Sequence, residues 1–394
     1  MPTTTSAIGQ RTMGVVLRPL DILFFRDGRP FGAATHAASR AAPLPQTFAG
    51  AIWTQLLVQY GCDFTQLRHR VTQQHEPIGD ALDALGLPAW IHQVSVRGPW
   101  FARIEIDAQK EAPEIMVPTP ATLLCPKEDG PAAALSPLRP LPSGTRLPGW
   151  ESTRCSQMKL RPLWPEGRAA MKPADGFLTA RGIRAFLAGE TVPTAEHVAA
   201  DELFAWDHRT GVGIDPTRLA AAESLIYRAQ FLALRRDLDA CKQTVFYAEV
   251  VVPEDAPDDV FDAVDTLAFG GEGRRVAVQR LDHPYDWRAL EPQSDRKASG
   301  KPLLVLTTPG MFDLPWCPNV IRNRVTAASV PAGVAVSGWD LARGGPKPNR
   351  SAVPPGSVYF LSEWIESLPD SLADQLLDRQ QGWGCYLTGV WNDD

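Results

Sequence analysis

Alternation of apolar and polar positions is the commonest pattern along this chain, and it predicts strands. Residues 93–106 (QVSVRGPWFARIEI) and 114–125 (EIMVPTPATLLC) alternate as half-buried antiparallel strands do. The apolar, β-branched segment 13–25 (MGVVLRPLDILFF) predicts a first strand that breaks near Pro19. Further strands are predicted at 224–235, 244–253, 274–281, 302–310, 332–340 and 356–362.

Helical spacing is rarer. Apolar residues recur every four positions from Phe48 to Tyr60, with Thr47 as the expected N-cap and Gly61 as the expected stop. Residues 258–271 (DDVFDAVDTLAFGG) predict a second amphipathic helix, and 174–190 a loop leading to a short one. The glycines of 204–216 (FAWDHRTGVGIDP) indicate a turn-rich segment, and the Pro-, Gly- and Ser-rich residues 128–164 indicate an irregular insertion.

The order of these elements predicts an α+β fold. A strand, a long loop and a helix open the chain, and a second half repeats a similar order with more strands than helices. Two ferredoxin-like (RRM-type) domains with antiparallel sheets and large loop insertions fit this order better than one doubly wound sheet. We expect them at residues 13–215 and 216–394.

Composition narrows the classes of function. The 394 residues carry a formal net charge of −6, so a nucleic-acid site would have to be a local patch. The 36 prolines and 31 glycines indicate short elements and large loops. The first residues resemble no signal peptide, and no apolar run is long enough to span a membrane. A cytoplasmic protein without a membrane partner is expected.

The motifs of common catalytic and metal sites are missing from the sequence. The seven histidines show neither HxxxH nor HExxH spacing, and the six cysteines form no CxxC pair. There is no GxSxG elbow, and no pair of carboxylates stands out as an acid–base couple. We therefore expect a protein that is not an enzyme, with no cofactor and no metal.

Basic residues gather instead in loops of small residues. The segment FFRDGRPFGAATHAASR holds Arg26, Arg29, His36 and Arg40. His36 has two interpretations: a general base for RNA cleavage, or a hydrogen-bonding or stacking partner for a nucleotide. Asp27 either orients one of the arginines or only caps the turn.

Three later segments have a similar character. RTGVGID (209–215) and FGGEGRR (269–275) place glycines beside arginine, and GWDLARGGPKPNRSAVPPGSVYF (338–360) predicts a long loop with Arg343, Lys347 and Arg350. Exposed backbone N–H groups and arginine bind phosphates, but solvated loops have the same composition. Trp206 and Trp339 adjoin basic segments and are candidates for stacking on a base, although most tryptophans are packing residues.

Several of these segments together resemble one known family. LRPLDILFFRDGRPFG, PLPQTFAGAIWTQLL, DHRTGVGIDPTRLAAAESLIY, LAFGGEGRR, GWDLARGGPKPNRSAVPPGSVYF and QGWGCYLTGVW are similar, in this order, to segments of the Cmr subunit three family. That family is a RAMP protein of type III-B CRISPR effector complexes. The resemblance covers nearly the whole chain, and the Pro-rich region near 130–150 and the net acidity depart from it.

The resemblance implies two ferredoxin-like RAMP domains and a non-catalytic RNA-binding role. The implied partners are the repeat-derived 5′ handle of CRISPR RNA, the large polymerase/cyclase-palm subunit, the backbone RAMP subunits and, indirectly, target RNA. The RNA-binding residues it implies are Arg26, Arg29, His36, Ser39, Arg40, Gln46, Arg209, Gly271, Gly273, Arg274, Arg275, Lys347 and Arg350. Two alternatives stay open: a RAMP-type repeat endoribonuclease using His36, and a purely protein–protein scaffold.

Overall fold

The computed structural model describes residues 9–25, 36–37, 42–106, 112–127, 133–145, 160–165, 170–215, 217–293 and 300–393. Its α-helices are α1 (Pro45–Gln59), α2 (Phe64–Gln73), α3 (Ile78–Ala84), α4 (Ala180–Leu187), α5 (Ala200–Leu203) and α7 (Leu376–Gln380). Within these ranges, 3₁₀ turns accompany them: η1 (Ala89–Gln93), η2 (Thr194–Glu196), η3 (Trp287–Leu290) and η4 (Asn319–Arg324).

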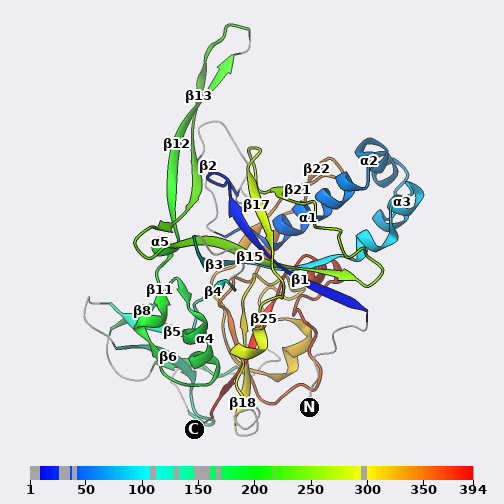
Figure 1. Cartoon of the computed structure of the whole chain (residues 1–394). Coiled ribbons are helices and arrows are strands. Elements are labelled where there is room, and N and C mark those ends of the chain that lie inside the picture. Colours follow the sequence, from blue (N-terminus) through cyan, green and yellow to red (C-terminus); the bar gives the residue numbers. More distant parts are fainter. Residues whose placement is uncertain are drawn as a thin grey trace.

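A nine-stranded sheet forms the centre of the molecule (Figure 1). Its order is β11 (His197–Val198), β9 (Phe177–Leu178), β4 (Glu114–Pro118), β3 (Ser95–Glu105), β15 (Lys242–Pro253), β1 (Gln10–Pro19), β17 (Arg275–Arg280) and β16 (Thr266–Ala268), and β14 (Arg236–Asp237) pairs with β15. β15 is antiparallel to both β1 and β3. Residues on the two sides of the expected 215/216 boundary therefore share one sheet, and the division into two ferredoxin-like domains stays a prediction.

Two hydrophobic cores cover the two faces of this sheet. Phe246 and Val250 of β15 lie in one core, together with the buried residues of α1. Val245 and Tyr247 point into the other core. That second core is closed by α4 and by a four-stranded sheet in the order β19 (Val325–Ser329), β24 (Val358–Leu361), β18 (Lys301–Leu306) and β25 (Tyr386–Trp391). Burial on both faces explains why β15 is apolar from Val245 to Pro253 except at Glu249.

Smaller sheets project from this body. β10 (Val192–Pro193), β6 (Ala134–Pro140), β5 (Leu123–Pro126) and β8 (Met171–Pro173) form one, and β7 (Leu163–Pro165) pairs with β6. β6 and β7 occupy part of the segment predicted as an irregular insertion at 128–164, so its described part is not wholly irregular. β20 (Val334–Val336) pairs with β23 (Arg350–Ala352), and β21 (Trp339–Asp340) with β22 (Gly345–Pro346). The long loop expected at 338–360 is thus largely a pair of nested hairpins.

A long hairpin, β12 (Phe204–Asp215) and β13 (Ala220–Leu234), extends away from the body (Figure 1). The prediction of a turn-rich segment at 204–216 was wrong. Gly211 lies inside the extended strand, and the pairing shifts its register between Val212 and Ile214, as glycine-containing strands often do. The short β2 (His36–Ala37) adds to β13 in parallel, while the other strand pairings of the described residues are antiparallel.

The helix predicted at 258–271 was also wrong. Residues 258–263 form isolated turns, with Val260 N–H bonded to Pro257 and Val264 N–H to Phe261, and β16 starts at Thr266. The predicted apolar residues Val260, Phe261, Val264 and Leu267 are nevertheless all buried in the core that contains α1. Burial therefore produced the apolar pattern, and the last part of the segment, residues 266–268, pairs with β17 as a strand.

Candidate nucleic-acid interface

Two arginines from distant parts of the chain meet over one aromatic ring at the base of the long hairpin. In the antiparallel register, Asp207 faces Phe231 and Arg209 faces Ala229, which places these side chains on one face. The guanidinium carbon of Arg209 lies 5.4 Å from the centroid of the Phe231 ring, and that of Arg274 lies 5.1 Å from it. Such distances are typical of cation–π contacts. Arg209 and Arg274, together with the Phe231 ring that both of them contact, are called the arginine pair below.

Two carboxylates hold the arginine pair in place. Asp207 accepts hydrogen bonds from Nε and Nη2 of Arg209 at 3.2 and 2.9 Å, and Asp21 is ion-paired with Nη1 of Arg274. A hydrogen bond from the backbone N–H of Ile22, and then the charge of Arg274, lower the pKa of Asp21. The bond to Asp207 raises the pKa of Arg209. A guanidinium has five N–H donors, so each arginine keeps donors for a further anion.

The glycine-rich loop 269–275 fixes the position of Arg274. Gly270 has φ +87°, and a Cβ there would lie 2.6 Å from the carbonyl oxygen of Phe24. The N–H of Gly271 donates to the same oxygen at 2.8 Å. Gly273 also has a positive φ, +65°, but faces open space. Only glycine permits this close approach, which fastens the loop to the chain just before the segment that holds Arg26 and Arg29.

The opening basic loop lies mostly outside the described residues. This applies to Arg26, Arg29, Ser39 and Arg40, and of His36 only the backbone is described. That backbone pairs with Arg228 in β2–β13. The described residues on either side of the loop have defined positions. Phe25, before it, packs on Phe269 with ring centroids 5.4 Å apart, and Leu44, after it, is the N-cap of α1. Phe25, the backbone of β2 and the first residues of α1 are therefore the described parts of the chain that flank the basic loop.

Other predicted residues lie near the start of α1. Gln46 donates from Nε2 to the carbonyl of Ser337 at 2.7 Å, so it holds the β21–β22 hairpin to α1. The N–H of Lys347 donates to the carbonyl of Gly338, also at 2.7 Å. Burial lowers the pKa of the Lys347 ammonium group. Arg275, by contrast, lies beside Arg274 in sequence but donates to Thr266 Oγ1 at 2.6 Å.

Arg350 is occupied by an internal ion pair. Its Nη1 and Nη2 donate to the two carboxylate oxygens of Asp378 at 2.7 and 2.6 Å. The Asp378 side chain is only 4% exposed, whereas that of Arg350 is 45% exposed. The hydrogen bonds to Asp378 raise the pKa of Arg350. A bidentate pair to a buried carboxylate joins β23 to α7, so the first role of Arg350 is structural.

Replacing Arg350 with alanine is expected to lower the free energy of unfolding by about 1–3 kcal/mol, because the buried carboxylate of Asp378 loses both donors. Arg350→Lys is expected to recover only part of this loss, since lysine cannot form the bidentate pair. Arg343→Ala is the matched control, because the Arg343 side chain is 60% exposed and its pair with Asp340 is worth less than about 0.5 kcal/mol. Denaturant unfolding measures all three, and equal losses for Arg350→Ala and Arg343→Ala would contradict the assignment.

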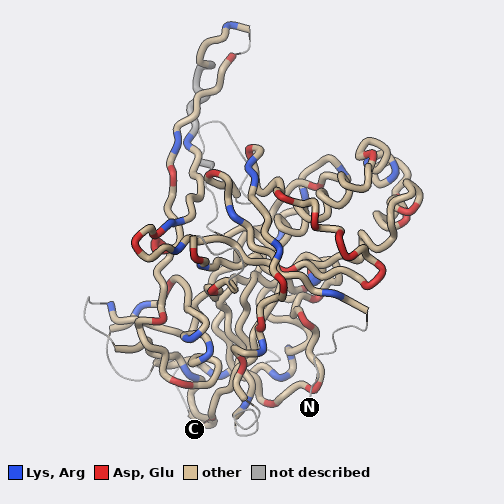
Figure 2. Tube along the Cα trace, in the orientation of Figure 1, with Lys and Arg blue, Asp and Glu red and all other residues tan. Residues whose placement is uncertain are grey.

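Figure 2 shows how the charges are distributed. Arginine occurs once on each strand of the hairpin, again at its tip, and in the loop that precedes β17, with acidic residues between these positions. The upper part of the molecule in this view therefore carries separate cations held by nearby carboxylates rather than one uniform basic surface. Asp21, Asp207 and Phe231 were not predicted as site residues. The two-residue spacing of Asp207 and Arg209 would have shown their shared face had the strand been recognised.

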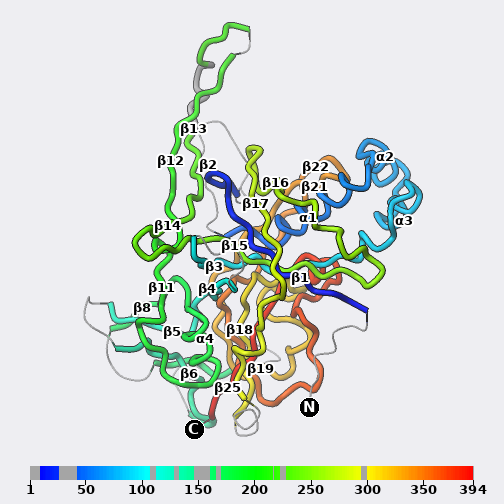
Figure 3. Tube along the Cα trace, viewed as in Figure 1, coloured from blue at the N-terminus to red at the C-terminus, as the bar shows by residue number. Residues whose placement is uncertain are grey.

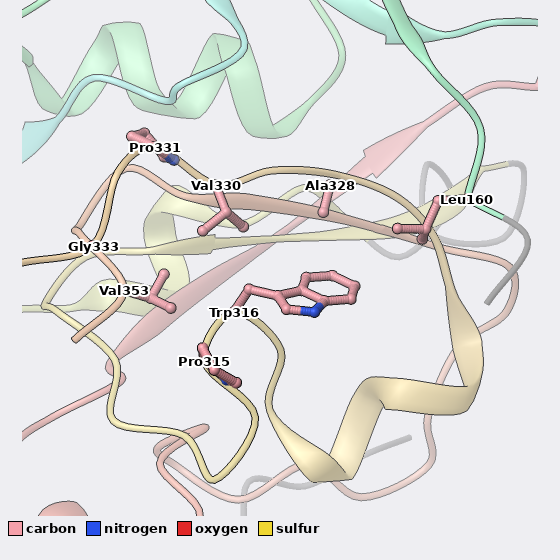
Figure 4. A pocket seen from close by; sticks show the side chains of 8 residues that line it. All are labelled: Leu160, Pro315, Trp316, Ala328, Val330, Pro331, Gly333 and Val353. Atoms are coloured by element: carbon pink, nitrogen blue, oxygen red, sulfur yellow. The ribbon is translucent and has the colours of Figure 1, made fainter. Parts of the chain in front are cut away.

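A pocket of about 370 Å³ lies elsewhere, beside the four-stranded sheet (Figure 4). Trp316, Pro315, Pro331 and Leu160 are among its eight lining residues, none of which is charged. Such a lining offers a phosphate no charged side chain. Within the described ranges, no three His, Cys, Asp or Glu side chains are grouped as metal ligands would be. The described helices also include none with the length and apolar character needed to cross a membrane.

A sequence-family comparison decides what the chain is related to. The family model described as CRISPR-associated protein (Cas_Cmr3) matches residues 15–391. The chain belongs to the Cas_Cmr3 family. This match confirms the resemblance inferred from the sequence segments, and it includes the arginine pair and the β21–β22 hairpin. None of the curated proteins compared with the chain matches it.

Solved structures show more distant likenesses to this Cas_Cmr3 protein. A chain of the type III-B Cmr-beta complex bound to cognate target RNA, determined by cryo-EM, is 14% identical, with a TM-score of 0.47. The likeness covers 88% of this chain and 86% of that one. A chain of the Csm3-Csm4 subcomplex of the type III-A CRISPR-Cas interference complex is 12% identical over 96% and 99% of the two chains, with a TM-score of 0.41. Because these scores are low, the family assignment rests on the sequence match.

Proposed function

We propose that this protein is a non-catalytic, RNA-binding subunit of a type III-B CRISPR effector complex. In this role it recognises the repeat-derived 5′ handle of CRISPR RNA and anchors the large polymerase/cyclase-type subunit, beside the backbone RAMP subunits. Two ferredoxin-like RAMP domains are part of the same proposal. Membership of the Cas_Cmr3 family supports the assignment to a CRISPR complex.

The observation that carries the RNA-binding part is the arginine pair. Arg209 and Arg274 come from separate segments, share the Phe231 ring, and are oriented by carboxylates. Gly271 fastens the loop that carries Arg274 to Phe24, two residues before Arg26. Cations on preorganised loops, rather than a uniformly basic protein, suit the backbone of single-stranded RNA. We place the phosphates of the handle along the arginine pair and the basic loop that starts at Arg26.

The opening loop gives the first test. A variant with both Arg26→Ala and Arg29→Ala is expected to bind CRISPR RNA more weakly and with a flatter salt dependence, because fewer counterions are released. Fluorescence anisotropy with end-labelled CRISPR RNA at two or more salt concentrations measures both quantities. Affinity and slope equal to those of the unmodified protein would remove these two residues from the interface.

A further inference from the structure

Trp339 is an unusually exposed tryptophan on an ordered support. The residue is 64% exposed, on the two-residue strand β21. Its cross-strand partner is Pro346 of β22, which is also exposed. Tryptophan is normally highly buried, and a large apolar ring left in water is typical of a binding surface. Figure 3 shows β21 and β22 at the same end of the molecule as the long hairpin, β17 and α1.

Contacts on the inner side of this small hairpin hold it in one arrangement. Gln46 of α1 binds Ser337, two residues before Trp339. Asp340 accepts hydrogen bonds from the backbone N–H and from Nη1 of Arg343, at 3.0 and 2.8 Å. Ala342 packs against the cluster formed by α2 and α3. The indole ring is therefore presented by a fixed backbone, which reduces the entropy lost when a ligand binds.

Several cations lie on the hairpin that carries the ring or pack against it. Arg68 of α2 packs against Gly344, where a Cβ would lie 2.8 Å from its Nε. Arg343 and Lys347 belong to the same hairpin segment, and Lys347 Cδ would lie 3.7 Å from a Cβ on Gly338, the residue before Trp339. Asp340 is the carboxylate of this segment and is paired with Arg343. The hairpin segment and the residue packed on it thus carry three cations, Arg68, Arg343 and Lys347, against the carboxylate of Asp340 and that of Asp378, whose charge also acts on Lys347.

We infer that Trp339 is a stacking platform for an unpaired base of the bound RNA, with Lys347 contacting the adjoining phosphate. This inference rests on the proposed RNA-binding function. An exposed aromatic ring beside a cation is the arrangement with which proteins hold single-stranded nucleic acid, since every base has a π-face. The excess of positive charge favours RNA over a protein partner, which is the competing occupant of an exposed tryptophan.

The test compares Trp339→Leu and Trp339→Phe in titrations with labelled CRISPR RNA. Trp339→Leu keeps apolar area but loses the aromatic face, and it is expected to weaken binding by about 5- to 100-fold. Trp339→Phe is expected to retain most of the affinity. Neither change removes a cation, so the salt slope stays as in the unmodified protein, whereas Lys347→Ala is expected to reduce it. Trp164→Leu is the matched control, because Trp164 is 54% exposed on β7, in another sheet.

A second measurement separates direct contact between Trp339 and RNA from an indirect effect of the substitution on RNA binding. RNA substituted with 5-iodouridine is irradiated on the complex, and the cross-linked peptide is identified by mass spectrometry; a cross-link at Trp339 is expected. RNA binding by Trp339→Leu equal to that of the unmodified protein would overturn the inference and leave the proposed function intact. The same holds if the variant loses only its association with the large subunit. Absence of RNA binding by the unmodified protein, even with that subunit, would overturn the proposed function and the inference with it.

Discussion

Replacing both Arg209 and Arg274 with alanine is expected to weaken binding of CRISPR RNA by about 10- to 100-fold at moderate salt. The two guanidinium groups lie over the Phe231 ring, and each is held by one carboxylate. Because their orientation is set before RNA arrives, little side-chain entropy is lost on binding. The slope of log affinity against log salt is expected to fall by about 1.4, or about 0.7 for each single-strand phosphate that an arginine no longer neutralises.

The control for this variant must remove the same charge elsewhere. Arg181 of α4 and Arg324 of η4 are suitable, because each is at least 40% exposed and paired with a glutamate, as Arg209 is paired with Asp207. The double variant with Arg181→Ala and Arg324→Ala is expected to keep the affinity and the slope nearly unchanged. Equal losses in the two double variants would mean that RNA responds to net charge alone, which would contradict a localised interface.

Replacing Gly270 with alanine is expected to lower the free energy of unfolding by about 2–4 kcal/mol. At φ +87° an alanine is strained, and its Cβ would approach the backbone carbonyl of Phe24 to 2.6 Å and the Phe25 ring to 3.0 Å. Neither neighbour moves easily, because Leu23 and Phe25 are buried in the core and Leu23 pairs with Leu232. Denaturant unfolding of the purified variant measures the loss.

Gly273→Ala is the control for this effect. Gly273 also has a positive φ, +65°, but a Cβ there would meet nothing within 4 Å. Only the cost of the left-handed conformation remains, about 1–2 kcal/mol. A loss for Gly270→Ala no larger than that for Gly273→Ala would show that the close approach to Phe24 does not constrain the loop.

The spacing of apolar residues in the sequence predicted individual elements such as α1 and β15 correctly. The helix expected up to Gly61 is α1, with Phe48, Ile52 and Leu56 buried and Gly61 at φ +70° beyond its end. Its start was misplaced, because Leu44 rather than Thr47 is the N-cap and Pro45 opens the helix. The largely apolar residues 244–253 of β15 were recognised as a strand. Its place between β1 and β3 could not be predicted, since pairing between distant segments leaves no local pattern.

The candidate site was predictable in composition but not in arrangement. Arginine beside glycine identified the segments that contain Arg209 and Arg274, but Phe231 was interpreted only as an apolar strand residue. Arg350 looked like a free cation because its partner, Asp378, lies 28 residues away in α7. Contacts of this kind depend on which strands become neighbours. A single sequence gives the residue types that a site needs and seldom the partners that orient them.

The central claim, recognition of the 5′ handle, is tested most directly by one titration. Labelled CRISPR RNA with an intact or a scrambled handle is added to the purified protein, alone and with the large subunit, at two salt concentrations, and the RNA is then examined on a gel. We predict tighter binding of the intact handle and uncut RNA. Equal binding of both handles, or no binding with the large subunit present, would contradict handle recognition. Cleavage of the RNA by the unmodified protein but not by the His36→Ala variant would establish the endoribonuclease instead.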